Sequence, residues 1–213
     1  KVKEILSEEA RQKKSRIYDI SEDNLNFKEK AGKYIDFLNA NAYDKERDVR
    51  TNIAGEFQKS NLAAALQTAE LICGRLDEDK IYEALSQIRI SGRMEEIAPG
   101  IIVDVSHNIQ GMQGFVQTVE ANYHGMKKRI LFAASHQNEE EYMKNILKTI
   151  PEIEAFYTVG IHKRRIDEAE FQDAFRKMID RNQETTVCFV VGSFYLAGMA
   201  KEFINQEEEN VRL

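Results

Sequence analysis

Four short apolar runs, each followed by an amphipathic helical pattern, constrain the fold of this chain more than any other feature of its sequence. A strand that is covered on both faces carries no polar alternation, so each run indicates a buried strand. The strands are expected at residues 101–104, 130–134, 155–159 and 186–191, and the helices at about 110–123, 139–149, 168–180 and 193–206. Strand–helix units in series, with right-handed crossovers, predict a mostly parallel, doubly wound α/β sheet.

The residues before this series have a different organisation. The expected elements are a polar helix at 3–14, a strand at 15–20, an irregular charged stretch at 21–30, hairpin strands at 32–39 and 46–54 with a turn at 41–45, and helices at about 57–73 and 78–89. So few strands are too little for a complete α/β domain. We therefore expect residues 1–93 to be the tail of a larger domain, and residues 94–213 to form a complete α/β domain.

Composition and charge exclude several classes of partner. The hydrophobic share of 42% and charged share of 31% fit an ordinary globular protein. The net charge of −6 leaves no electrostatic footprint for nucleic acid or for an anionic membrane. The basic clusters at 127–129 and 163–165 are most simply solvated faces, although the second can also serve a phosphate. No apolar stretch approaches the ~18 residues of a membrane span, and no signal-peptide pattern opens the chain.

The cysteines and histidines indicate the compartment and the absence of a metal site. Cys73 and Cys188 each lie in an apolar context, which predicts buried free thiols in a reducing, cytoplasmic compartment. The chain has four histidines, and no pair of them has the spacing of metal ligands. We therefore expect no metal ligands in this chain.

Residues 101–108, with the sequence IIVDVSHN, place three functional side chains directly after a buried strand. Asp104, His107 and Asn108 bring together a carboxylate, an imidazole and an amide at the carboxyl end of that strand. In open α/β sheets, ligands bind at this edge. Asp, Ser and Asn are also ordinary residues at a helix start, so a purely structural role is the alternative.

Three other positions have both a ligand-binding and a structural interpretation. Arg93 follows Gly92 in the joint between the two halves, where a guanidinium can reach a phosphate or simply lie on the surface. Ser193 follows Gly192 at the start of the last helix, where it can help to bind an anion or cap the helix. Asn61, near the start of the first long helix, can contact an adenine edge or act as a cap.

Several motifs are absent from the sequence. It contains no G-x-x-x-x-G-K-[ST], so the chain carries no phosphate loop. No G-x-G-x-x-G follows the strand at 101–104, which argues against a dinucleotide oxidoreductase. G-x-S-x-G is missing too, which leaves a serine hydrolase without support.

Four segments together resemble the carboxyl-terminal part of folylpolyglutamate synthase/dihydrofolate synthase, in the Mur ligase superfamily. They are residues 55–66 (GEFQKSNLAAAL), 91–97 (SGRMEEI), 104–108 (DVSHN) and 191–198 (VGSFYLAG). Gly-Arg-x-Glu followed by Asp-x-x-His-Asn is the specific part, and Gly-Ser-x-Tyr-Leu favours the folate branch over the peptidoglycan branch. The resemblance implies the carboxyl-terminal part of a central ATP-binding domain at 1–93, and a Rossmann-like ligase domain at 94–213.

The resemblance also implies an activity and roles for individual residues. Such a ligase uses ATP and Mg²⁺ to convert the carboxylate of folate or dihydropteroate into an acyl phosphate, which the amine of L-glutamate then attacks. Asn61, Arg93, Asp104 and Asn108 match positions near ATP. His107 matches the histidine that faces both the nucleotide and the amino acid, in a catalytic and substrate-binding role. Ser193 matches less well, near the glutamate, and the complete enzyme is expected to be a monomer.

Three departures from the family pattern leave other functions open. Phe57 replaces the usual His, and Ser-His-Gln-Asn at 135–138 replaces the usual Asp-Lys-Asp. The phosphate loop and most magnesium ligands are expected in a front part that this sequence lacks, so we expect no ATP hydrolysis by this piece alone. The alternatives are a Mur-type ligase for a peptidoglycan precursor, and a degenerate domain that binds a nucleotide or a protein partner without catalysis.

Overall fold

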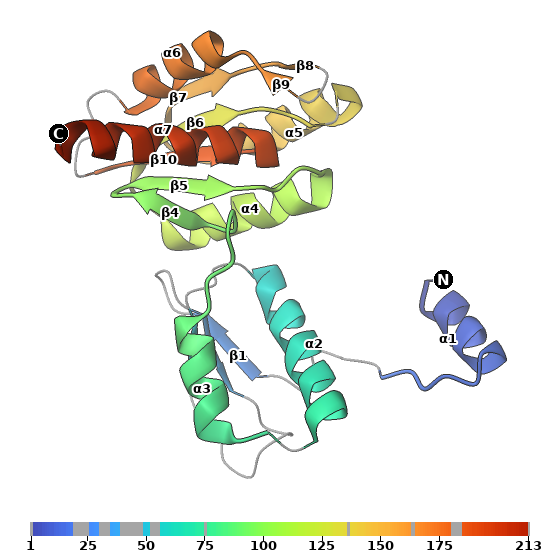
Figure 1. Cartoon of the computed structure of the whole chain (residues 1–213). Helices are drawn as coiled ribbons and strands as arrows, with labels where there is room; N and C mark the ends of the chain where they lie inside the picture. The colour runs from blue at the N-terminus through green and yellow to red at the C-terminus, as the bar shows by residue number, and fades with distance from the viewer. Residues whose placement is uncertain are drawn as a thin grey trace.

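The computed structural model describes most of the chain. The described residues are 2–18, 26–29, 35–38, 49–51, 56–74, 76–135, 137–162, 165–179 and 185–212. Their helices and strands form two groups, which a single segment of backbone around residues 88–94 joins (Figure 1).

The second group is built on a five-stranded sheet with the order β4-β5-β10-β6-β7. Its strands are β4 (Glu95–Ala98), β5 (Ile101–Asp104), β6 (Lys127–Phe132), β7 (Ile153–Thr158) and β10 (Thr186–Val191). The last four strands are mutually parallel, while β4 pairs antiparallel with β5 across an irregularity between Glu96 and Ala98. The expected mostly parallel α/β sheet is confirmed, with β4 as an additional edge strand.

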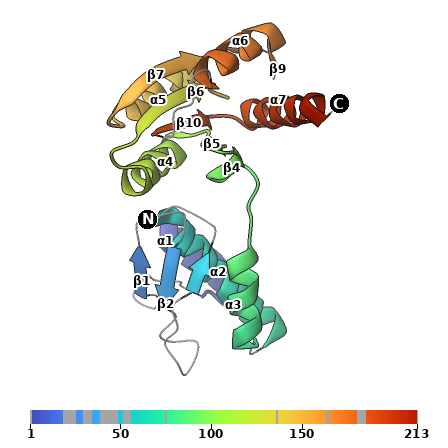
Figure 2. The same cartoon turned by 90° about the vertical axis from the view of Figure 1, so that its left-hand side faces the viewer.

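Helices cover both faces of this sheet (Figures 1 and 2). The helices α4 (Ile109–Asn122) and α5 (Glu140–Leu147) lie on one face, and α6 (Glu168–Ile179) and α7 (Phe194–Arg212) lie on the other. A short 3₁₀ helix, η2 (Gln137–Glu139), precedes α5, and the two-residue strands β8 (Ile161–His162) and β9 (Arg165–Ile166) precede α6.

The central strand β10 is apolar because helices cover the sheet on both of its faces. All six of its residues are buried. Val187 and Phe189 pack into the core beneath α4 and α5, while Cys188 and Val190 pack into the core beneath α6 and α7. Side chains alternate between the faces of a strand, so a strand covered on both faces is predominantly apolar.

The sheet has a topological switch point between β5 and β10. These strands are neighbours, and Val191 pairs with Asp104 at their carboxyl ends. The chain leaves β5 into α4 on one face and leaves β10 into α7 on the opposite face. Ligands of open α/β sheets bind in the crevice that such diverging connections leave.

The first group is smaller. The strands β1 (Asn26–Glu29), β2 (Ile35–Leu38) and β3 (Val49–Thr51) form an antiparallel sheet that lies beside α2 (Glu56–Cys73) and α3 (Glu78–Gln87) (Figure 2). The helix α1 (Val2–Gln12) has no buried residue and stands apart from the other elements in Figure 1.

Several expectations for the first group need correction. The hairpin is confirmed as β2 and β3, but its turn at 41–45 lies outside the described residues. The stretch at 21–30 was expected to be irregular, and this is wrong because it contains β1, which pairs with β2. Of the strand expected at 15–20, residues 15–18 have no regular structure, and residues 19–20 are outside the described part.

Of the basic residues at 127–129, at the amino end of β6, Lys127 is exposed, as expected, but Lys128 and Arg129 are buried. Lys128 is fully buried and its Nζ lies 2.8 Å from Glu152 Oε2. The Arg129 Nε donates to Glu154 Oε2 at 2.9 Å, and its NH1 donates to the carbonyl of Met178 at 3.0 Å. The expectation of solvation is therefore wrong for both residues, because paired carboxylates and a carbonyl replace water around them.

The two cysteines differ in their surroundings. Cys188 is buried, and this burial raises the pKa of its thiol to about 11. Cys73 is exposed at the end of α2 beside the exposed Leu71 and Ile72, so the expectation that it is buried is wrong. Among the described residues, no helix combines the length and the hydropathy that a membrane crossing needs.

Candidate functional site

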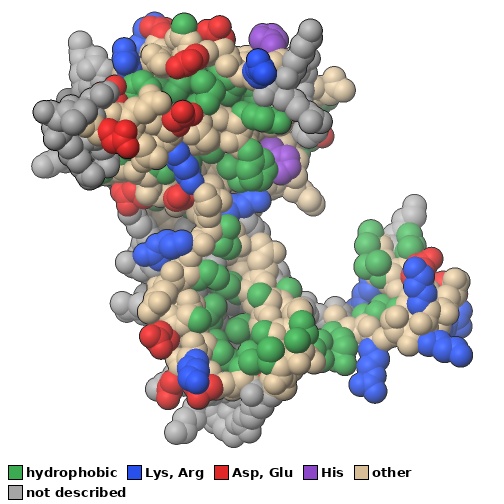
Figure 3. All heavy atoms as spheres, in the orientation of Figure 1, with side chains coloured by type: hydrophobic (Ala, Val, Ile, Leu, Met, Phe, Trp, Pro, Cys, Tyr) green, Lys and Arg blue, Asp and Glu red, His purple; other side chains and the backbone are tan. Residues whose placement is uncertain are grey.

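The segment of residues 88–94 that connects the two groups is called the joint. A cleft of about 580 Å³ lies where α2, the joint and the start of α4 meet. Its lining residues are Gln58, Asn61, Ile90, Arg93, Ser106, His107, Asn108, Gln110 and Gly111. Small-molecule sites in proteins typically have volumes of roughly 300–1,000 Å³, so this cleft has the size of a ligand site. Figure 3 shows basic side chains on the surface where the two groups meet.

The joint is fixed to the carboxyl end of β5 by its backbone. Gly92 has a φ of +71°, and a Cβ at this position would lie 2.7 Å from Cγ1 of Val105. The Val105 N–H donates to the Gly92 carbonyl at 2.8 Å. Met94 also has a left-handed backbone, with a φ of +45°, and its N–H donates to Asp104 Oδ2 at 3.0 Å. Glycine is therefore required at 92 by both its conformation and its close approach to β5.

Arg93 lies between these two left-handed residues and lines the cleft. It is half-buried, and its backbone N–H donates to the Ile90 carbonyl at 3.1 Å. Its guanidinium makes no hydrogen bond or ion pair with any residue that the structure describes. The guanidinium of a half-buried arginine in a cleft is suited to bidentate binding of an anion.

Asp104 adjoins the cleft but does not line it. Its side chain is buried, with Oδ1 accepting from the Ser106 N–H at 2.8 Å and from the Ser106 hydroxyl at 2.5 Å. Burial raises the pKa of Asp104 above its ordinary value, against the opposing influence of these hydrogen bonds, of the Met94 N–H and of the Arg93 charge. Its oxygens are thus occupied by the chain itself, and a contact between Asp104 and ATP stays a prediction.

His107 lines the cleft and also touches the beginning of α7. Its Nδ1 lies 3.0 Å from the carbonyl oxygen of Val105. A carbonyl can only accept, so Nδ1 carries the proton, and the neutral ring has its acceptor at Nε2. The imidazole packs against the ring of Phe194, with 5.6 Å between ring centroids. Phe194 is 59% exposed, so α7 presents an aromatic surface next to the imidazole.

Asn108 and Asn61 enter the cleft from different helices. Asn108 is the N-cap of α4, where its Oδ1 accepts from the Gly111 N–H at 2.7 Å, so the structural interpretation of this residue is confirmed. Asn61 lies inside α2 rather than at its start, so the capping interpretation is wrong. Its Nδ2 donates to Oε1 of Gln58 at 2.9 Å.

Ser193 is buried at the start of α7 and does not line the cleft. Its hydroxyl accepts from the N–H groups of Tyr195 at 3.0 Å and Leu196 at 3.3 Å, which confirms the helix-cap alternative. Gly192 before it has a φ of +110°, and a Cβ there would lie 2.6 Å from the Ala133 carbonyl. A contact between Ser193 and glutamate stays a prediction.

Sequence reasoning missed several residues of the cleft. Gln58 is almost fully buried and shares a face of α2 with Asn61, a spacing of three residues that could have indicated it. Ser106 lies between Asp104 and Asn108 in the sequence, so its place at the cleft could have been inferred from theirs. The remaining missed residues are Ile90, Gln110 and Gly111.

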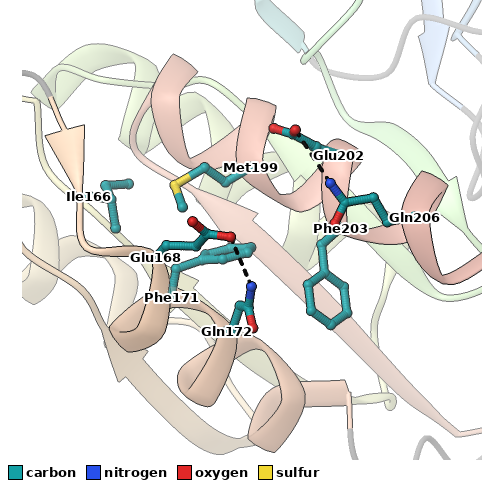
Figure 4. Close-up of a pocket in the computed structure, with 8 residues that line it drawn as sticks. All are labelled: Ile166, Glu168, Phe171, Gln172, Met199, Glu202, Phe203 and Gln206. Atoms are coloured by element: carbon teal, nitrogen blue, oxygen red, sulfur yellow. Dashed lines mark hydrogen bonds between the residues drawn. The ribbon is translucent and has the colours of Figure 1, made fainter.

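A second, smaller cavity of about 220 Å³ lies between α6 and α7 (Figure 4). The rings of Phe171 and Phe203 form part of its apolar wall. Its carboxylates are bonded within their own helices, Glu168 by Gln172 and Glu202 by Gln206. We assign no function to this cavity because its polar groups are satisfied locally.

Across the described ranges, no group of three or more His, Cys, Asp or Glu side chains could hold a metal ion. The side chains of the cleft are mainly amides, a hydroxyl, an imidazole and a guanidinium. Magnesium prefers carboxylate and other oxygen ligands, so the described lining does not fit a magnesium site.

No protein-family model matches the sequence, and no curated protein sequence matches it either. The structure, however, is similar to solved structures of ligases. The apo form of Lactobacillus casei folylpolyglutamate synthetase superposes with a TM-score of 0.74 at 16% identity, covering 94% of this chain and 49% of that chain. Folylpolyglutamate synthase from Thermotoga maritima gives a TM-score of 0.67 at 22% identity, covering 95% of this chain and 51% of that chain.

A pseudomurein peptide ligase type C from Methanothermus fervidus is also similar, with a TM-score of 0.63 at 18% identity over 86% of this chain and 42% of that chain. Solved folylpolyglutamate synthase structures include a complex with AMPPCP and folate. The chain spans about half the length of the folylpolyglutamate synthase structures that it matches. The resemblance found in the sequence is thereby confirmed at the level of the fold, which this chain shares with folylpolyglutamate synthases and with a pseudomurein peptide ligase.

Proposed function

We propose that this chain is part of an ATP-dependent amide ligase of the folylpolyglutamate synthase/dihydrofolate synthase type, and that its cleft binds the phosphates of ATP. The observation that carries the proposal is the guanidinium of the half-buried Arg93, a residue that lines the cleft without a hydrogen-bond or ion-pair partner among the described residues. The complex of a folylpolyglutamate synthase with AMPPCP and folate supports ATP and a folate as ligands.

The walls of the cleft suit a nucleotide. Arg93 supplies two parallel N–H donors that match phosphate oxygens. The amino end of α4 lies at the cleft through Asn108, Gln110 and Gly111, and the positive end of a helix favours an anion. The amide of Asn61, which lines the cleft from α2, is suited to hydrogen bonds with the adenine edge.

The proposed reaction has two steps. The γ-phosphoryl group of ATP passes to a carboxylate oxygen of the folate or dihydropteroate, which gives an acyl phosphate and ADP. The amine of L-glutamate then attacks the acyl carbon, so that a C–N bond forms, the C–O bond to phosphate breaks, and phosphate leaves. His107 accepts the amine proton at Nε2, because Nδ1 is held by the Val105 carbonyl.

The complete reaction needs groups that the chain does not supply. Its sequence has no phosphate loop, which is the element that cradles the β- and γ-phosphates in ATPases of this kind. Among the described residues, no group of three or more His, Cys, Asp or Glu side chains could hold the magnesium ion. We therefore propose that the chain forms one wall of the nucleotide site and does not turn over ATP by itself.

A peptide ligase is the second candidate, because the fold is also that of a pseudomurein peptide ligase. Both candidates join an amine to an activated carboxylate, and they differ in the acceptor. The Gly-Ser-x-Tyr-Leu sequence at 192–196 favours the folate acceptor.

Calorimetric titration of the full chain with ATP tests the nucleotide proposal. We expect Arg93→Ala to weaken ATP binding about 10-fold or more, because a charge-assisted contact is lost. Arg89→Ala is the matched control: Arg89 is an exposed arginine four residues earlier that does not line the cleft, and its NH1 donates to the Ile88 carbonyl. An Arg93→Ala affinity within about twofold of the unmodified chain would show that the cleft does not bind phosphate through Arg93.

A further inference from the structure

We propose that Lys201 and Glu95 are positioning residues, which hold the joint in the conformation that directs Arg93 into the cleft. The inference rests on the proposed function, because it takes the phosphates of ATP as the ligand of Arg93. Lys201 lies in the second turn of α7 and Glu95 begins β4, so the pair links two elements of the second group directly after the joint.

The ammonium of Lys201 binds Ser91, which lies in the joint, and Glu95, which directly follows the joint. Its Nζ donates to Glu95 Oε2 at 2.5 Å and to Ser91 Oγ at 2.6 Å. The same Glu95 oxygen accepts from the Gly92 N–H at 2.5 Å. One cation and one carboxylate therefore fix the side chain of Ser91 and the backbone of Gly92, immediately before Arg93.

The opposite side of the joint is held by β5. The Val105 N–H bonds the Gly92 carbonyl, and Asp104 accepts from the Met94 N–H. The residues on both sides of Arg93 are thus fixed, while the Arg93 side chain itself lines the cleft. A backbone that is already ordered reduces the conformational entropy lost when the guanidinium binds a ligand.

The pair differs from an ordinary surface ion pair. The side chains of Lys201 and Glu95 are 28% and 32% exposed, and the residues are separated by 106 positions in sequence. Partial burial weakens the screening by water, and the hydrogen bond to a backbone N–H adds directionality. A purely structural pair would change the stability of the fold, but not the affinity of the folded protein for ATP.

The test is a double-mutant cycle on the full chain, with ATP as the titrant and calorimetry as the readout. We expect Lys201→Met to weaken ATP binding about 3- to 10-fold, and to have no further effect in the Arg93→Ala background, because the two residues act through one contact. Lys144→Met is the matched control, since it removes a 2.6 Å pair with Glu140 on α5, outside the cleft. Urea unfolding establishes that every variant is folded under the titration conditions.

Two further variants separate charge from geometry. Lys201→Arg keeps donors for both Ser91 and Glu95, so we expect an ATP affinity within about twofold of the unmodified chain. The double variant Glu95→Lys with Lys201→Glu keeps both charges but removes the acceptor for the Gly92 N–H. We therefore expect it to bind ATP as weakly as Lys201→Met does.

The possible outcomes distinguish the two proposals. If Arg93→Ala weakens ATP binding and Lys201→Met does not, the positioning role is wrong and the nucleotide cleft stands. An equal effect of Lys201→Met with and without Arg93 also overturns the positioning role. If the unmodified chain does not bind ATP, or if Arg93→Ala leaves binding unchanged, the proposed function fails and the positioning role fails with it.

Discussion

The carboxylate of Asp104 accepts a hydrogen bond from the backbone N–H of Met94 at 3.0 Å, and so ties the joint to the end of β5. The other oxygen of the same carboxylate holds Ser106, which lines the cleft. One buried side chain thereby fixes the positions of both Arg93 and the segment that carries His107. Asp104 therefore contributes to the spatial relation between the guanidinium and the imidazole, together with the bond from the Val105 N–H to the Gly92 carbonyl.

We expect Asp104→Ala to lower the free energy of unfolding by about 2–4 kcal/mol, because the N–H groups of Met94 and Ser106 lose their acceptor. Urea unfolding at neutral pH measures the change. Asp173→Ala is the control, since it removes an exposed pair with Lys177 and should change stability by less than about 0.5 kcal/mol. Equal losses in the two variants would contradict the structural role of Asp104.

Gly92→Ala should destabilise the protein more than Gly125→Ala does. Both glycines have a left-handed backbone, with φ of +71° and +76°. A Cβ at 92 meets Val105 at 2.7 Å, whereas a Cβ at 125 meets nothing within 4 Å. We expect losses of about 2–4 kcal/mol and about 1 kcal/mol, respectively, in urea unfolding. The comparison isolates the steric contact with Val105, directly after β5. Equal losses of unfolding free energy in the two variants would contradict a role for this contact.

Much of the α/β fold could be predicted because the strands are buried on both faces. The apolar runs in β5, β6 and β10 have this pattern, whereas β7 lies at the edge of the sheet and is only partly buried. All four are parallel strands. The edge strand β4 has the sequence EEIA, which shows neither an apolar run nor alternation. Its strand conformation comes from pairing with β5, which is a tertiary effect.

The site could be predicted only where its residues are close in sequence. Asp104, His107 and Asn108 follow one strand, so their position at the sheet edge could be inferred directly. The approach of α2 to α4, which brings Asn61 and Gln58 to the cleft, has no counterpart in any local pattern. The contact of Lys201 with Glu95 and Ser91 likewise joins segments that are far apart in the chain.

The stability of the joint should depend on pH through Glu95. Burial is the largest influence and acts to raise its pKa, but the hydrogen bonds from Lys201, Gly92 and Ser91 together hold the pKa below its ordinary value of 4.5. A lowered folded-state pKa gives stability that is present above the unfolded value and lost as the pH falls through the folded value. Below about pH 4.5, we expect the free energy of unfolding of Glu95→Gln, measured in urea, to fall less steeply with falling pH than that of the unmodified protein. Parallel pH profiles for the two proteins would contradict this.

Residues 94–213 should fold without residues 1–93. This segment contains the complete five-stranded sheet and both of its apolar cores. Residues 1–93 contain the exposed apolar side chains of α1 and the end of α2, so we expect that segment to be poorly ordered alone. Circular dichroism during urea unfolding of each segment measures this. A cooperative transition of the 1–93 segment would contradict the proposed division.

In the complete ligase that the proposed function implies, Arg93 and His107 should affect different substrates. Arg93→Ala removes a charge-assisted contact worth about 1.5–3 kcal/mol, so we expect kcat/KM for ATP to fall about 10- to 150-fold. Arg93→Lys keeps the charge but loses the planar pair of donors, and should recover only part of this loss.

His107→Ala should lower kcat/KM for the amino acid and leave the KM for ATP unchanged, because its imidazole accepts the amine proton in the proposed reaction. His107→Asn keeps a donor for the Val105 carbonyl but lacks the acceptor at Nε2, so it should be as impaired as the alanine variant. Steady-state kinetics with ATP and glutamate varied separately measures both effects. Full activity of His107→Asn would show that His107 only holds its segment in place. An unchanged KM and kcat for ATP in Arg93→Ala would contradict the proposal that the cleft binds ATP.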